Sequence, residues 1–397
     1  MSKLEELIKE LCPDGVEYKT IGEICEITRG RVMSKEYLRD NAGEYPVYSS
    51  QTTNNGIFGF INNYDYDCES ITWTTDGANA GSVFYHINEK FSITNVCGLL
   101  KVIDRSHINT RFIYYCLQII AKDYVNSGMG NPKLMSNVMA RVKIPLPPLP
   151  VQQEIVRILD KFTELTAELT AELEARKKQY EYYRDLLLTF GDEVPRVAID
   201  DLFNIRNGYT PSKSNKEYWE NGVIPWFRME DIRENGRILS NALQHVSINA
   251  VKGRPFPANS IIISTSATIG EHALIQTEFL ANQRFTILSL KNEYQDVNIK
   301  YLFYYCYILG EWCKNNLTLG HFASVDMVAF KKFRIPLPPL EEQERIVSIL
   351  DRFDALCNDL TIGLPAEIEA RQKQYEYYRD KLLSFKPLPS KDEEAVE

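Results

Sequence analysis

The segment IPLPPLPVQQEIVRILDKF at residues 144–162 decides how this chain folds, because it occurs a second time as IPLPPLEEQERIVSILDRF at residues 335–353. The two copies match at 13 of 19 positions. A further segment follows each copy, AELEARKKQYEYYRDLLLTF at 171–190 and AEIEARQKQYEYYRDKLLSF at 366–385, and these match at 16 of 20 positions. The chain is therefore a tandem duplication in which each half ends in nearly the same segment.

The repeated segment predicts a long helix. Its prolines favour an extended entry and place the start of the helix near Val151 or Gln152. Apolar residues then recur over residues 155–190 in alternating steps of four and three if Thr166 and Arg176 fill the missing positions. The second copy repeats this pattern over 346–385 with a shift at its four extra residues. We expect two antiparallel helices forming a coiled-coil spacer, the first about 58 Å long. The second copy has four extra residues, which predict a kink or break beside Gly363 and Pro365.

Two plainer interpretations of the repeat stay open. The paired helices alone are compatible with an ordinary coiled-coil hairpin. The proline run before each helix has the spacing of an SH3-type ligand, but its recurrence at the same place in both halves favours an architectural role.

The stretches between the repeats predict two strand-rich domains of related plan. Runs rich in Ile, Val, Tyr, Phe and Thr predict strands at residues 20–28, 45–49, 57–61, 70–75, 82–86 and 98–103, followed by a helix at 110–124. AIDDLFNIRNGYTPSKS, which starts at residue 198, parallels TIGEICEITRGRVMSKE from residue 20, with Gly208 at the place of Gly30. We expect both glycines to serve the backbone, and Trp73, Trp219 and Trp226 to lie in cores.

The predicted fold class is α+β, with two variable domains, two spacer helices and an internal pseudo-two-fold repeat. The predicted segments are a first domain at 1–143, a spacer helix at 144–190, a second domain at 191–334, a second spacer helix at 335–386 and a disordered acidic tail at 387–397.

The charge balance gives no positive sign of a nucleic-acid partner. The net charge is −9, and much of it comes from residues 335–397, which hold 8 basic and 14 acidic residues. Near-neutral domains can still carry a basic face. No apolar run approaches the roughly 18 residues of a membrane span, and residues 1–11 do not form a secretory signal. We expect a cytoplasmic protein.

The sequence offers no constellation for catalysis or metal binding. The motifs GxxxxGK[ST], HExxH, GxSxG and GxGxxG are absent, and Asn131-Pro132-Lys133 is not the Asn-Pro-Pro-aromatic motif of amino-methylating enzymes. The eight cysteines form no CxxC pair and the five histidines lie at least 21 residues apart, which predicts reduced thiols and no structural zinc. We predict a protein that is not an enzyme and holds no metal.

The repeats resemble those of one protein family. Two segments of the form IPLPPL-xx-Q-xx-IVxILDxF, each running into EARxKQYEYYRDxLL between divergent domains, are similar to the specificity subunit (HsdS) of type I restriction-modification systems. The resemblance covers essentially the whole chain. It implies two α/β target recognition domains that each read one half of a split, asymmetric DNA site, and a spacer made of the repeat helices. It also implies that the chain has no catalytic role of its own.

The resemblance further implies partners and cofactors. Double-stranded DNA is the expected ligand of the two domains. The spacer helices would bind modification subunits, expected to number two, which carry S-adenosylmethionine, and restriction subunits using ATP and Mg²⁺ would join them. No cofactor is expected on this chain. An acidic chain is compatible with DNA binding if basic faces are local and the partners supply much of the phosphate contact.

Base readout would use Arg or Lys for guanine and Asn or Gln for adenine, with Ser and Thr less selective. Such side chains gather on the loops of both domains. The candidates in the first domain are Arg29, Arg31, Ser50, Gln51, Asn54, Asn55, Thr74, Asn79, Asn131 and Lys133. The candidates in the second domain are Tyr209, Thr210, Ser212, Lys213, Arg228, Ser264, Ser266, Gln283, Arg284 and His321. Each has a plain alternative as a solvated loop residue or a turn cap.

The outward surface of the spacer helices is where the resemblance implies docking of the catalytic partners. The candidate docking residues are Tyr180, Tyr182, Arg184, Tyr375, Tyr377 and Arg379. From the residues alone, a different function also stays open, in which the paired helices form an adaptor that joins two protein-binding domains without DNA. Co-purification with a methyltransferase would distinguish the two.

Overall fold

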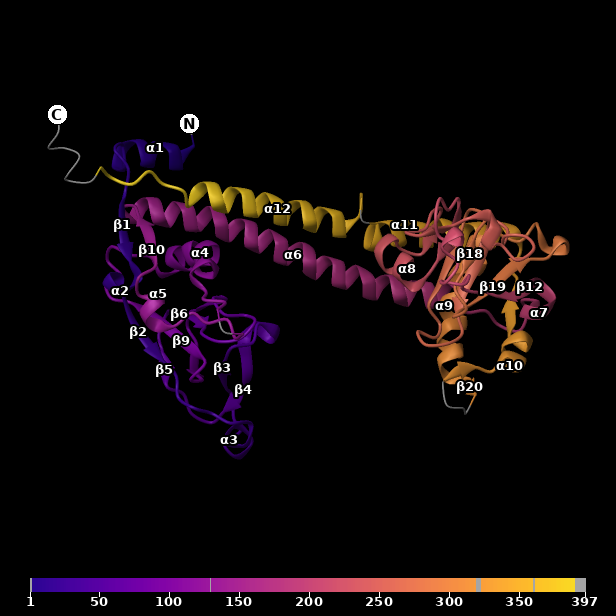
Figure 1. Ribbon diagram of the computed structural model, residues 1–397, viewed down its shortest axis with the longest axis horizontal. Coiled ribbons are helices and arrows are strands. Elements are labelled where there is room, and N and C mark those ends of the chain that lie inside the picture. Colours follow the sequence, from indigo (N-terminus) through magenta and orange to yellow (C-terminus); the bar gives the residue numbers. More distant parts are fainter. Residues whose placement is uncertain (1, 129, 319–322, 360, 390–397) are drawn as a thin grey trace. The chain divides into compact units, whose positions relative to one another are not determined.

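The computed structural model describes residues 2–128, 130–318, 323–359 and 361–389. The chain forms two compact units, one made of Met1–Ala167 and Ala370–Glu397 and the other of Glu168–Glu369. Each unit contains one strand-rich domain together with parts of both repeated segments (Figure 1). The duplication in the sequence thus has a counterpart in two units of similar content.

Unit 1 contains two four-stranded sheets. One has the order β2-β9-β6-β7 with antiparallel neighbours, and the other has the order β4-β3-β8-β5, in which β3 and β8 are parallel. Strand β6, SITWT, is buried at all five positions, and Trp73 lies in the core as predicted. The elements before the spacer are α1 (Lys3–Leu11), β1 (Glu17–Thr20), α2 (Ile21–Ile24), β2 (Cys25–Arg29), α3 (Lys35–Asp40), β3 (Tyr45–Tyr48), η1 (Thr53–Gly56), β4 (Ile57–Ile61), β5 (Tyr66–Asp67), β6 (Ser70–Thr74), β7 (Val83–His86), β8 (Lys90–Ile93), β9 (Cys97–Val102), α4 (Thr110–Ile120), η2 (Ala121–Tyr124), α5 (Ser136–Met139) and β10 (Lys143–Leu146).

Unit 2 repeats this framework and enlarges it. Its main sheet has the order β12-β19-β16-β17-β14, and a three-stranded sheet has the order β15-β13-β18. Strand β16, SIIIS, is buried throughout, like β6. The elements are β11 (Arg196–Ala198), α7 (Ile199–Leu202), β12 (Phe203–Asn207), η3 (Lys216–Tyr218), β13 (Ile224–Phe227), α8 (Met229–Asn235), β14 (Ile238–Leu239), β15 (His245–Val246), η4 (Ile248–Ala250), β16 (Ser260–Ser264), β17 (His272–Ile275), β18 (Leu280–Ala281), β19 (Phe285–Leu290), η5 (Asn292–Tyr294), α9 (Ile299–Asn315), β20 (Leu317–Thr318), β21 (Ser324–Val325), α10 (Met327–Lys332) and β22 (Arg334–Pro336).

The predicted strand at residues 20–28 is wrong in its first half. Residues Ile21–Ile24 form one helical turn, α2, and the strand β2 begins only at Cys25. The Glu23 carboxylate accepts hydrogen bonds from the backbone nitrogen and the hydroxyl of Thr20, at 2.7 and 2.6 Å, which caps the turn. Local capping therefore outweighs the strand propensity of the isoleucines. The other predicted strands are present, and β1, β5, β8 and β10 are additional.

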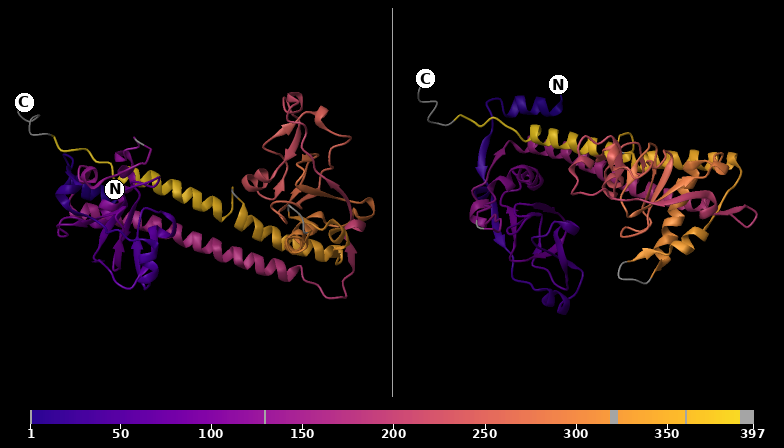
Figure 2. Two further views of the ribbon diagram at one scale, coloured as in Figure 1. Left: turned by 60° about the horizontal axis from the view of Figure 1, so that its bottom comes forward. Right: turned by 45° about the vertical axis from the view of Figure 1, so that its right-hand side comes forward.

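The spacer helices pair in each unit. Helix α6 (Leu149–Leu187) is continuous over 39 residues, whereas the second repeat forms α11 (Leu340–Asn358) and α12 (Leu364–Leu382). Figure 2 shows α12 and α11 lying alongside α6. In unit 1, the rings of Phe162 and Tyr378 stack at 5.6 Å, and in unit 2 those of Tyr180 and Phe353 stack at 6.0 Å. The helices are antiparallel, because residue numbers rise from Phe162 to Tyr180 along α6 while those of their partners fall from Tyr378 to Phe353.

The predicted break in the second spacer helix is confirmed. After α11, the Asp359 side chain accepts hydrogen bonds from the backbone nitrogens of Thr361 and Ile362, at 2.7 and 3.1 Å. Gly363 donates its own N–H to the Asp359 carbonyl, and α12 begins at Leu364. The four extra residues are thus accommodated in a capped turn between two helices.

The repeated glutamine connects each spacer helix to the domain that precedes it through the same hydrogen bonds in both units. In unit 1, Gln152 is fully buried, accepts the N–H of Asn109 at 2.9 Å and donates to the carbonyl of Pro147 at 2.7 Å. In unit 2, Gln343 accepts the N–H of Asn298 at 2.9 Å and donates to the carbonyl of Pro338 at 2.8 Å. One amide therefore ties the proline entry of the spacer helix to the start of α4 or α9.

The repeated aspartate adds a second tie on the same helices. Asp160 accepts the hydroxyl of Tyr115 at 2.6 Å and pairs with Arg111 at 2.7 Å. Its counterpart Asp351 accepts the hydroxyl of Tyr304 and pairs with Lys300, both at 2.7 Å. The equivalent tyrosines lie on α4 and α9, so each spacer helix is fixed to its own domain by the same pair of side chains.

The apolar seam of the spacer is not purely a helix-to-helix contact. Ile155 and Leu159 of α6 are fully buried in the core of unit 1, and Ile346 and Leu350 of α11 are fully buried in the core of unit 2. The first turns of each repeat therefore pack on the domain that precedes them. A heptad period predicts that one face of the helix is buried. It does not predict whether another helix or a domain core covers that face.

The last described residues belong to unit 1. Val16 donates its N–H to the carbonyl of Lys386 at 2.9 Å, and Leu388 donates to the carbonyl of Val16 at 3.0 Å. Tyr18 donates its hydroxyl to the Phe385 carbonyl at 2.9 Å. The backbone of Lys386 and Leu388 is thus paired with Val16, just before β1, although a disordered tail was predicted to begin at residue 387. Residues 390–397 lie outside the described residues.

Candidate nucleic-acid interface

The two domains present equivalent edges where β2, β6 and β9 of unit 1, and β12, β16 and β19 of unit 2, meet the following loops. Strand registers and loop hydrogen bonds define the correspondence: the N–H of Thr75 donates to Val96 at 3.1 Å, and that of Thr265 donates to Arg284 at 3.0 Å. The equivalent pairs are Arg29 with Asn207, Ser49 with Arg228, Thr75 with Thr265, Asp76 with Ser266, Thr94 with Asn282, Val96 with Arg284 and Lys133 with Ser324.

Gly30 and Gly208 have the backbone role that the sequence predicted. A Cβ on Gly30 would lie 2.0 Å from the carbonyl oxygen of Ile93, and one on Gly208 would lie 2.2 Å from that of Asn282. Any larger residue would push the neighbouring loop away. The glycines therefore let the strand ends that carry Arg29 and Asn207 approach the loops before β9 and β19 closely.

Arg29 is held by its own domain. Its Nη2 donates to the Asn95 carbonyl at 2.7 Å and to the Thr75 hydroxyl at 3.2 Å, and it lies 3.6 Å from the Asp76 carboxylate. The other oxygen of Asp76 lies 3.6 Å from Nζ of Lys133. One carboxylate therefore sits between the two candidate cations of this edge.

Arg31 is also committed to neighbours. Its Nε donates to Asp65 at 3.0 Å and its Nη1 donates to the Tyr37 hydroxyl at 3.0 Å. Its Nη2 lies 3.5 Å from the side-chain oxygen of Asn63. The hydrogen bonds to Tyr37 and Asp65 raise the pKa of Arg31. Nη2 of Arg29 and all three nitrogens of the Arg31 guanidinium thus have partners within the protein.

The remaining candidates of the first domain divide by exposure. Thr74 is fully buried and its hydroxyl donates to the Asn79 carbonyl, so it holds the 75–81 turn and is not on the surface. Gln51 donates its amide to the Ile57 carbonyl. Asn54 and Asn55 are exposed at positive φ. Those with exposed or partly exposed side chains are Ser50, Gln51, Asn54, Asn55, Asn79, Asn131 and Lys133.

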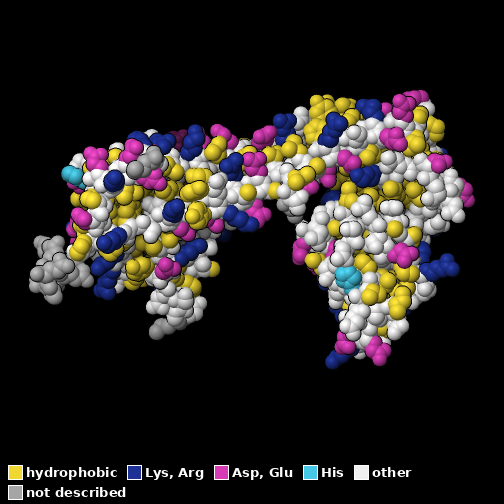
Figure 3. Space-filling model, turned by 90° about the horizontal axis from the view of Figure 1, so that it is seen from above, with side chains coloured by type: hydrophobic (Ala, Val, Ile, Leu, Met, Phe, Trp, Pro, Cys, Tyr) yellow, Lys and Arg dark blue, Asp and Glu magenta, His cyan; other side chains and the backbone are white. Residues whose placement is uncertain are grey.

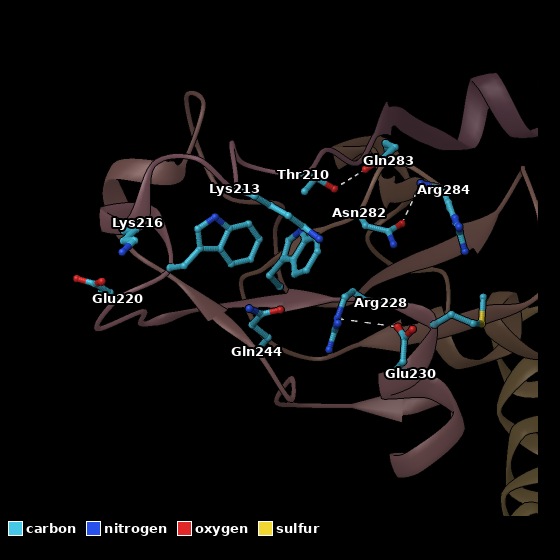
Figure 4. A pocket seen from close by; sticks show the side chains of 13 residues that line it. Thr210, Lys213, Lys216, Glu220, Arg228, Glu230, Gln244, Asn282, Gln283 and Arg284 are labelled. Carbon is cyan, nitrogen blue, oxygen red and sulfur yellow. Dashed lines mark hydrogen bonds and ion pairs between the residues drawn. The ribbon is translucent and has the colours of Figure 1, made fainter.

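The second domain contains a cavity at the equivalent edge. Its volume is about 580 Å³, and Figure 4 shows the side chains that surround it. Five of the residues that were predicted to contact DNA line this cavity: Thr210, Lys213, Arg228, Gln283 and Arg284. Lys216, Trp219, Gln244 and Asn282 also line it and were not among the candidates. Four cations and three side-chain amides thus face one cavity, against only two carboxylates, Glu220 and Glu230.

Arg228 is the most constrained side chain in this cavity. Its guanidinium carbon lies 5.6 Å from the centre of the Trp226 ring, and its Nε lies 3.9 Å from Glu230. That Nε is buried and finds no hydrogen-bond partner among the described residues. Asp231 fixes the backbone beneath it by accepting the N–H groups of Arg228 and Leu243 at 2.7 and 2.6 Å. The guanidinium is therefore positioned by stacking, while its donors remain uncommitted.

The tryptophans of this cavity differ in exposure. Trp226 is buried, as predicted, and donates its Nε1 to the Tyr209 carbonyl at 3.1 Å. Trp219 is only partly buried and meets Trp226 edge to face at 5.0 Å. The prediction that Trp219 lies in the core is therefore wrong in part, because one side of this ring forms the cavity wall. Residue type alone does not separate an aromatic residue of the core from one that lines a cavity.

The other candidates of the second domain have local partners. Ser264 is fully buried and its hydroxyl donates to the Ser266 carbonyl at 2.8 Å. Tyr209 accepts the N–H of Lys252 at 2.7 Å, and Ser212 bonds to Ser214 at 2.7 Å. These hydroxyls organise loops around the cavity. His321 lies outside the described residues.

The predicted docking surface of the spacer helices needs correction. Tyr180 is 4% exposed, and Arg184 packs over the ring of Tyr307 on α9 at 4.4 Å. Tyr375 donates its hydroxyl to Gln118 at 3.1 Å, and Arg379 lies over the Tyr375 ring. These four lie against the domain of the unit that contains them, Tyr180 and Arg184 in unit 2 and Tyr375 and Arg379 in unit 1, because they share a helix face with the apolar seam. Tyr182 and Tyr377 are 65% and 62% exposed and are the outward pair.

The described residues supply no evident metal or redox chemistry. Within them, no group of three or more His, Cys, Asp or Glu side chains is arranged to hold a metal ion. Burial raises the pKa of the Cys25, Cys97 and Cys313 thiols to about 12, which disfavours the reactive thiolate. In the same part of the chain, no helix combines the length and apolar character needed to cross a bilayer.

Surface charge is locally mixed. On the face drawn in Figure 3, basic and acidic side chains alternate over both units and form no large field of one sign. The cavity of Figure 4 is thus a local concentration of positive charge in a chain whose net charge is −9. Local concentration of this kind is what recognition of a polyanion by an acidic protein requires.

Comparison with known proteins identifies the family. A model of the type I restriction modification DNA specificity domain matches residues 13–176 and 192–370. The EcoR124I/EcoR124II specificity subunit of Escherichia coli is 35% identical over 416 residues, covering 98% of this chain and 99% of that protein. The EcoprrI specificity subunit of Escherichia coli is 60% identical over 205 residues, which is 49% of this chain and 51% of that protein.

A solved structure shares the fold. The S subunit of the type I restriction-modification system from M. genitalium aligns with a TM-score of 0.57 at 15% identity, covering 93% of this chain and 96% of that chain. The chain belongs to the family of type I restriction-modification DNA specificity subunits, and it is accordingly a non-catalytic subunit with two strand-rich target recognition domains.

Proposed function

We propose that each domain reads one half of a bipartite, asymmetric DNA site, so that the chain sets the sequence at which its complex acts. The observation that carries this proposal is the equivalence of the two edges. Backbone positions match between the domains, while the side chains on them differ: Arg29 against Asn207, Asp76 against Ser266 and Val96 against Arg284. One framework with two sets of polar side chains is what reading two different half-sites requires.

The repeated helices would fix the separation of the half-sites. A continuous helix of 39 residues is about 58 Å long, longer than one turn of DNA at roughly 34–36 Å. Two domains joined by such a helix would leave an unread gap between their half-sites. The ties through Gln152, Gln343, Asp160 and Asp351 would hold each domain at a fixed angle to its helix.

The same helices would bind the catalytic partners in the cytoplasm. Tyr182 and Tyr377 occupy equivalent repeat positions and are strongly exposed, which fits docking of two modification subunits, one per repeat. The modification subunits would supply S-adenosylmethionine, and restriction subunits would supply ATP and Mg²⁺ chemistry. The adaptor interpretation is set aside, because membership in a DNA specificity family favours DNA as the ligand.

A domain exchange tests this function. Residues 1–143 are replaced by those of another family member, and the chimera is expressed with the modification subunits and its methylome is sequenced. Only the first half-site should change, and the matched exchange of residues 191–334 should change only the second. Deleting residues 360–363 should alter the tolerated gap or abolish assembly, without changing either half-site. A contiguous recognition site, or a first half-site indifferent to the first exchange, contradicts the proposal.

A further inference from the structure

Two positions of the equivalent edges carry arginine in the second domain only. Arg228 and Arg284 of the second domain both line the cavity of Figure 4. Their counterparts in the first domain are Ser49 and Val96, because the N–H of Thr94 bonds to the Tyr48 carbonyl as that of Asn282 bonds to the Phe227 carbonyl. Two of the residues that line this cavity are therefore arginines at positions where the first domain has shorter, uncharged side chains.

In the first domain the equivalent residues are uncharged, and Ser49 and its neighbour Thr94 are buried. Ser49 is 9% exposed and Thr94 is 3% exposed, and the Thr94 hydroxyl donates to that of Ser49 at 2.9 Å. Neither side chain has reach or charge to offer to a ligand. The arginines that the first domain does carry nearby, Arg29 and Arg31, donate to Asn95, Asp65 and other protein groups instead.

In the second domain the cations are available. Among the described residues, Arg284, Lys213 and Lys216 make no ion pair with a carboxylate. Arg228 has only Glu230 at 3.9 Å, which is at the limit of an ion pair. Figure 4 shows Asn282 beside Arg284, Gln283 beside Thr210, and Arg228 beside Glu230 around this cavity.

The geometry of Arg228 restricts how it can bind. Its Nε is buried, so the two terminal nitrogens are the donors left for a ligand. The guanidinium carbon lies over the Trp226 ring, 5.6 Å from its centre, which is within the range of a cation–π contact and limits the freedom of the group. Two parallel N–H groups on a fixed plane match the O6 and N7 acceptors of guanine in the major groove, the commonest specific arginine contact.

We propose that Arg228 reads a guanine in the half-site bound by the second domain. Arg284 assists it within the same cavity, and Lys213 and Lys216 contact the flanking phosphates. The first domain reads its half-site without a counterpart to this arginine. This inference rests on the proposed function, since it names the base chemistry of one of the two half-sites.

The experiment uses the full chain assembled with its modification subunits and sequences the methylome of cells carrying each variant. Arg228→Ala should relax the second half-site at one or two adjacent G·C positions, lowering discrimination roughly ten- to a hundredfold. Arg228→Lys, which keeps the charge but loses the paired donors, should relax the same positions. Lys216→Ala should weaken binding at all sequences alike, with the consensus unchanged. Arg233→Ala, an exposed arginine on α8 that does not line this cavity, should leave the methylome as it was.

The outcomes separate the two proposals. If the wild-type complex methylates no bipartite site, the proposed function itself fails. If it does, and Arg228→Ala and Arg228→Lys both leave every position of the second half-site unchanged, only the guanine contact is overturned. Uniform loss of methylation in both variants, with subunit assembly intact, also overturns it, because that is the signature of a phosphate contact. Relaxation confined to the first half-site would assign the cavity to the other half and overturn it as well.

Discussion

The two recognition edges share their backbone and differ in whether their cations are free. In the first domain, Asp76 lies 3.6 Å from both Arg29 and Lys133, and Asp65 holds Arg31. In the second domain, the residue equivalent to Asp76 is Ser266, and Arg228 and Arg284 face an open cavity. The comparison shows that the two domains keep the same strand backbone while the side chains at this edge differ. Side chains can alter charge, reach and pairing there without disturbing the strands beneath.

The shared framework gives the largest expected effect. Gln152→Ala and Gln343→Ala each leave a buried backbone N–H and a buried carbonyl without a partner, which should cost about 2–5 kcal/mol of unfolding free energy in either unit. Hydrogen exchange of the full chain should show the start of α4 opening in the first variant and that of α9 in the second.

A surface glutamine provides the control for the framework prediction. Gln372→Ala, on the exposed face of α12, should change the stability by less than about 0.5 kcal/mol. Clearly unequal losses from the two buried glutamines would show that the two halves of the framework are not equivalent in energy.

A buried histidine that only the second domain has at this position predicts that the stability of unit 2 falls at acid pH. His272 is 1% exposed, its Nε2 has no partner among the described residues, and the equivalent position in unit 1 is Val83. Burial, with Arg237 nearby, lowers the pKa of His272 to about 3. The unfolded chain, with a histidine pKa of about 6.5, therefore binds more protons below that pH. Unit 2 should lose about 2 kcal/mol of stability between pH 6.5 and pH 5 through this group.

Replacing the histidine by the residue of the other domain tests this pH effect. His272→Val should abolish that part of the acid sensitivity, measured as the difference in unfolding temperature between pH 7.5 and pH 5. Comparing two pH values on one variant removes the packing cost of the substitution itself. His245→Gln, a partly exposed histidine of the same unit, serves as the control. An unchanged pH difference in His272→Val would mean that other groups set the acid response.

The smallest expected effect is on DNA binding, from removing the carboxylate that lies between Arg29 and Lys133. Asp76→Asn keeps the acceptor for the Thr75 hydroxyl but removes the charge between Arg29 and Lys133. Non-specific duplex binding by the assembled complex should tighten, and its log–log salt dependence should steepen by about 1–2, near 0.9 for each added phosphate contact. The reciprocal change Ser266→Asp should weaken binding in the second domain. Identical salt slopes before and after Asp76→Asn would mean that neither cation reaches DNA.

Much of the candidate site was visible in the sequence as residue types on loops, but its organisation was not. Thr74 and Ser264 have the composition of readout residues and are buried, because strand pairing turns them inward. Lys216, Gln244 and Asn282 line the cavity and were missed, since residues from three separate segments converge there only after β13, β15 and β19 are placed. The spacer tyrosines were misassigned for a similar reason. Tyr180 and Tyr182 are two residues apart, and only the helix phase against α9 decides which faces outward.

The sequence by itself determined the duplication, the long helices, the break beside Gly363 and the family, because repetition and period are properties of residue order. Only the tertiary structure decided which cations are free. Whether Arg29 or Arg228 can meet a base depends on carboxylates and carbonyls brought from distant segments, such as Asn95 and Asp76. Hydrogen-bond partners are set by position in space, and a linear pattern of residue types does not contain that information.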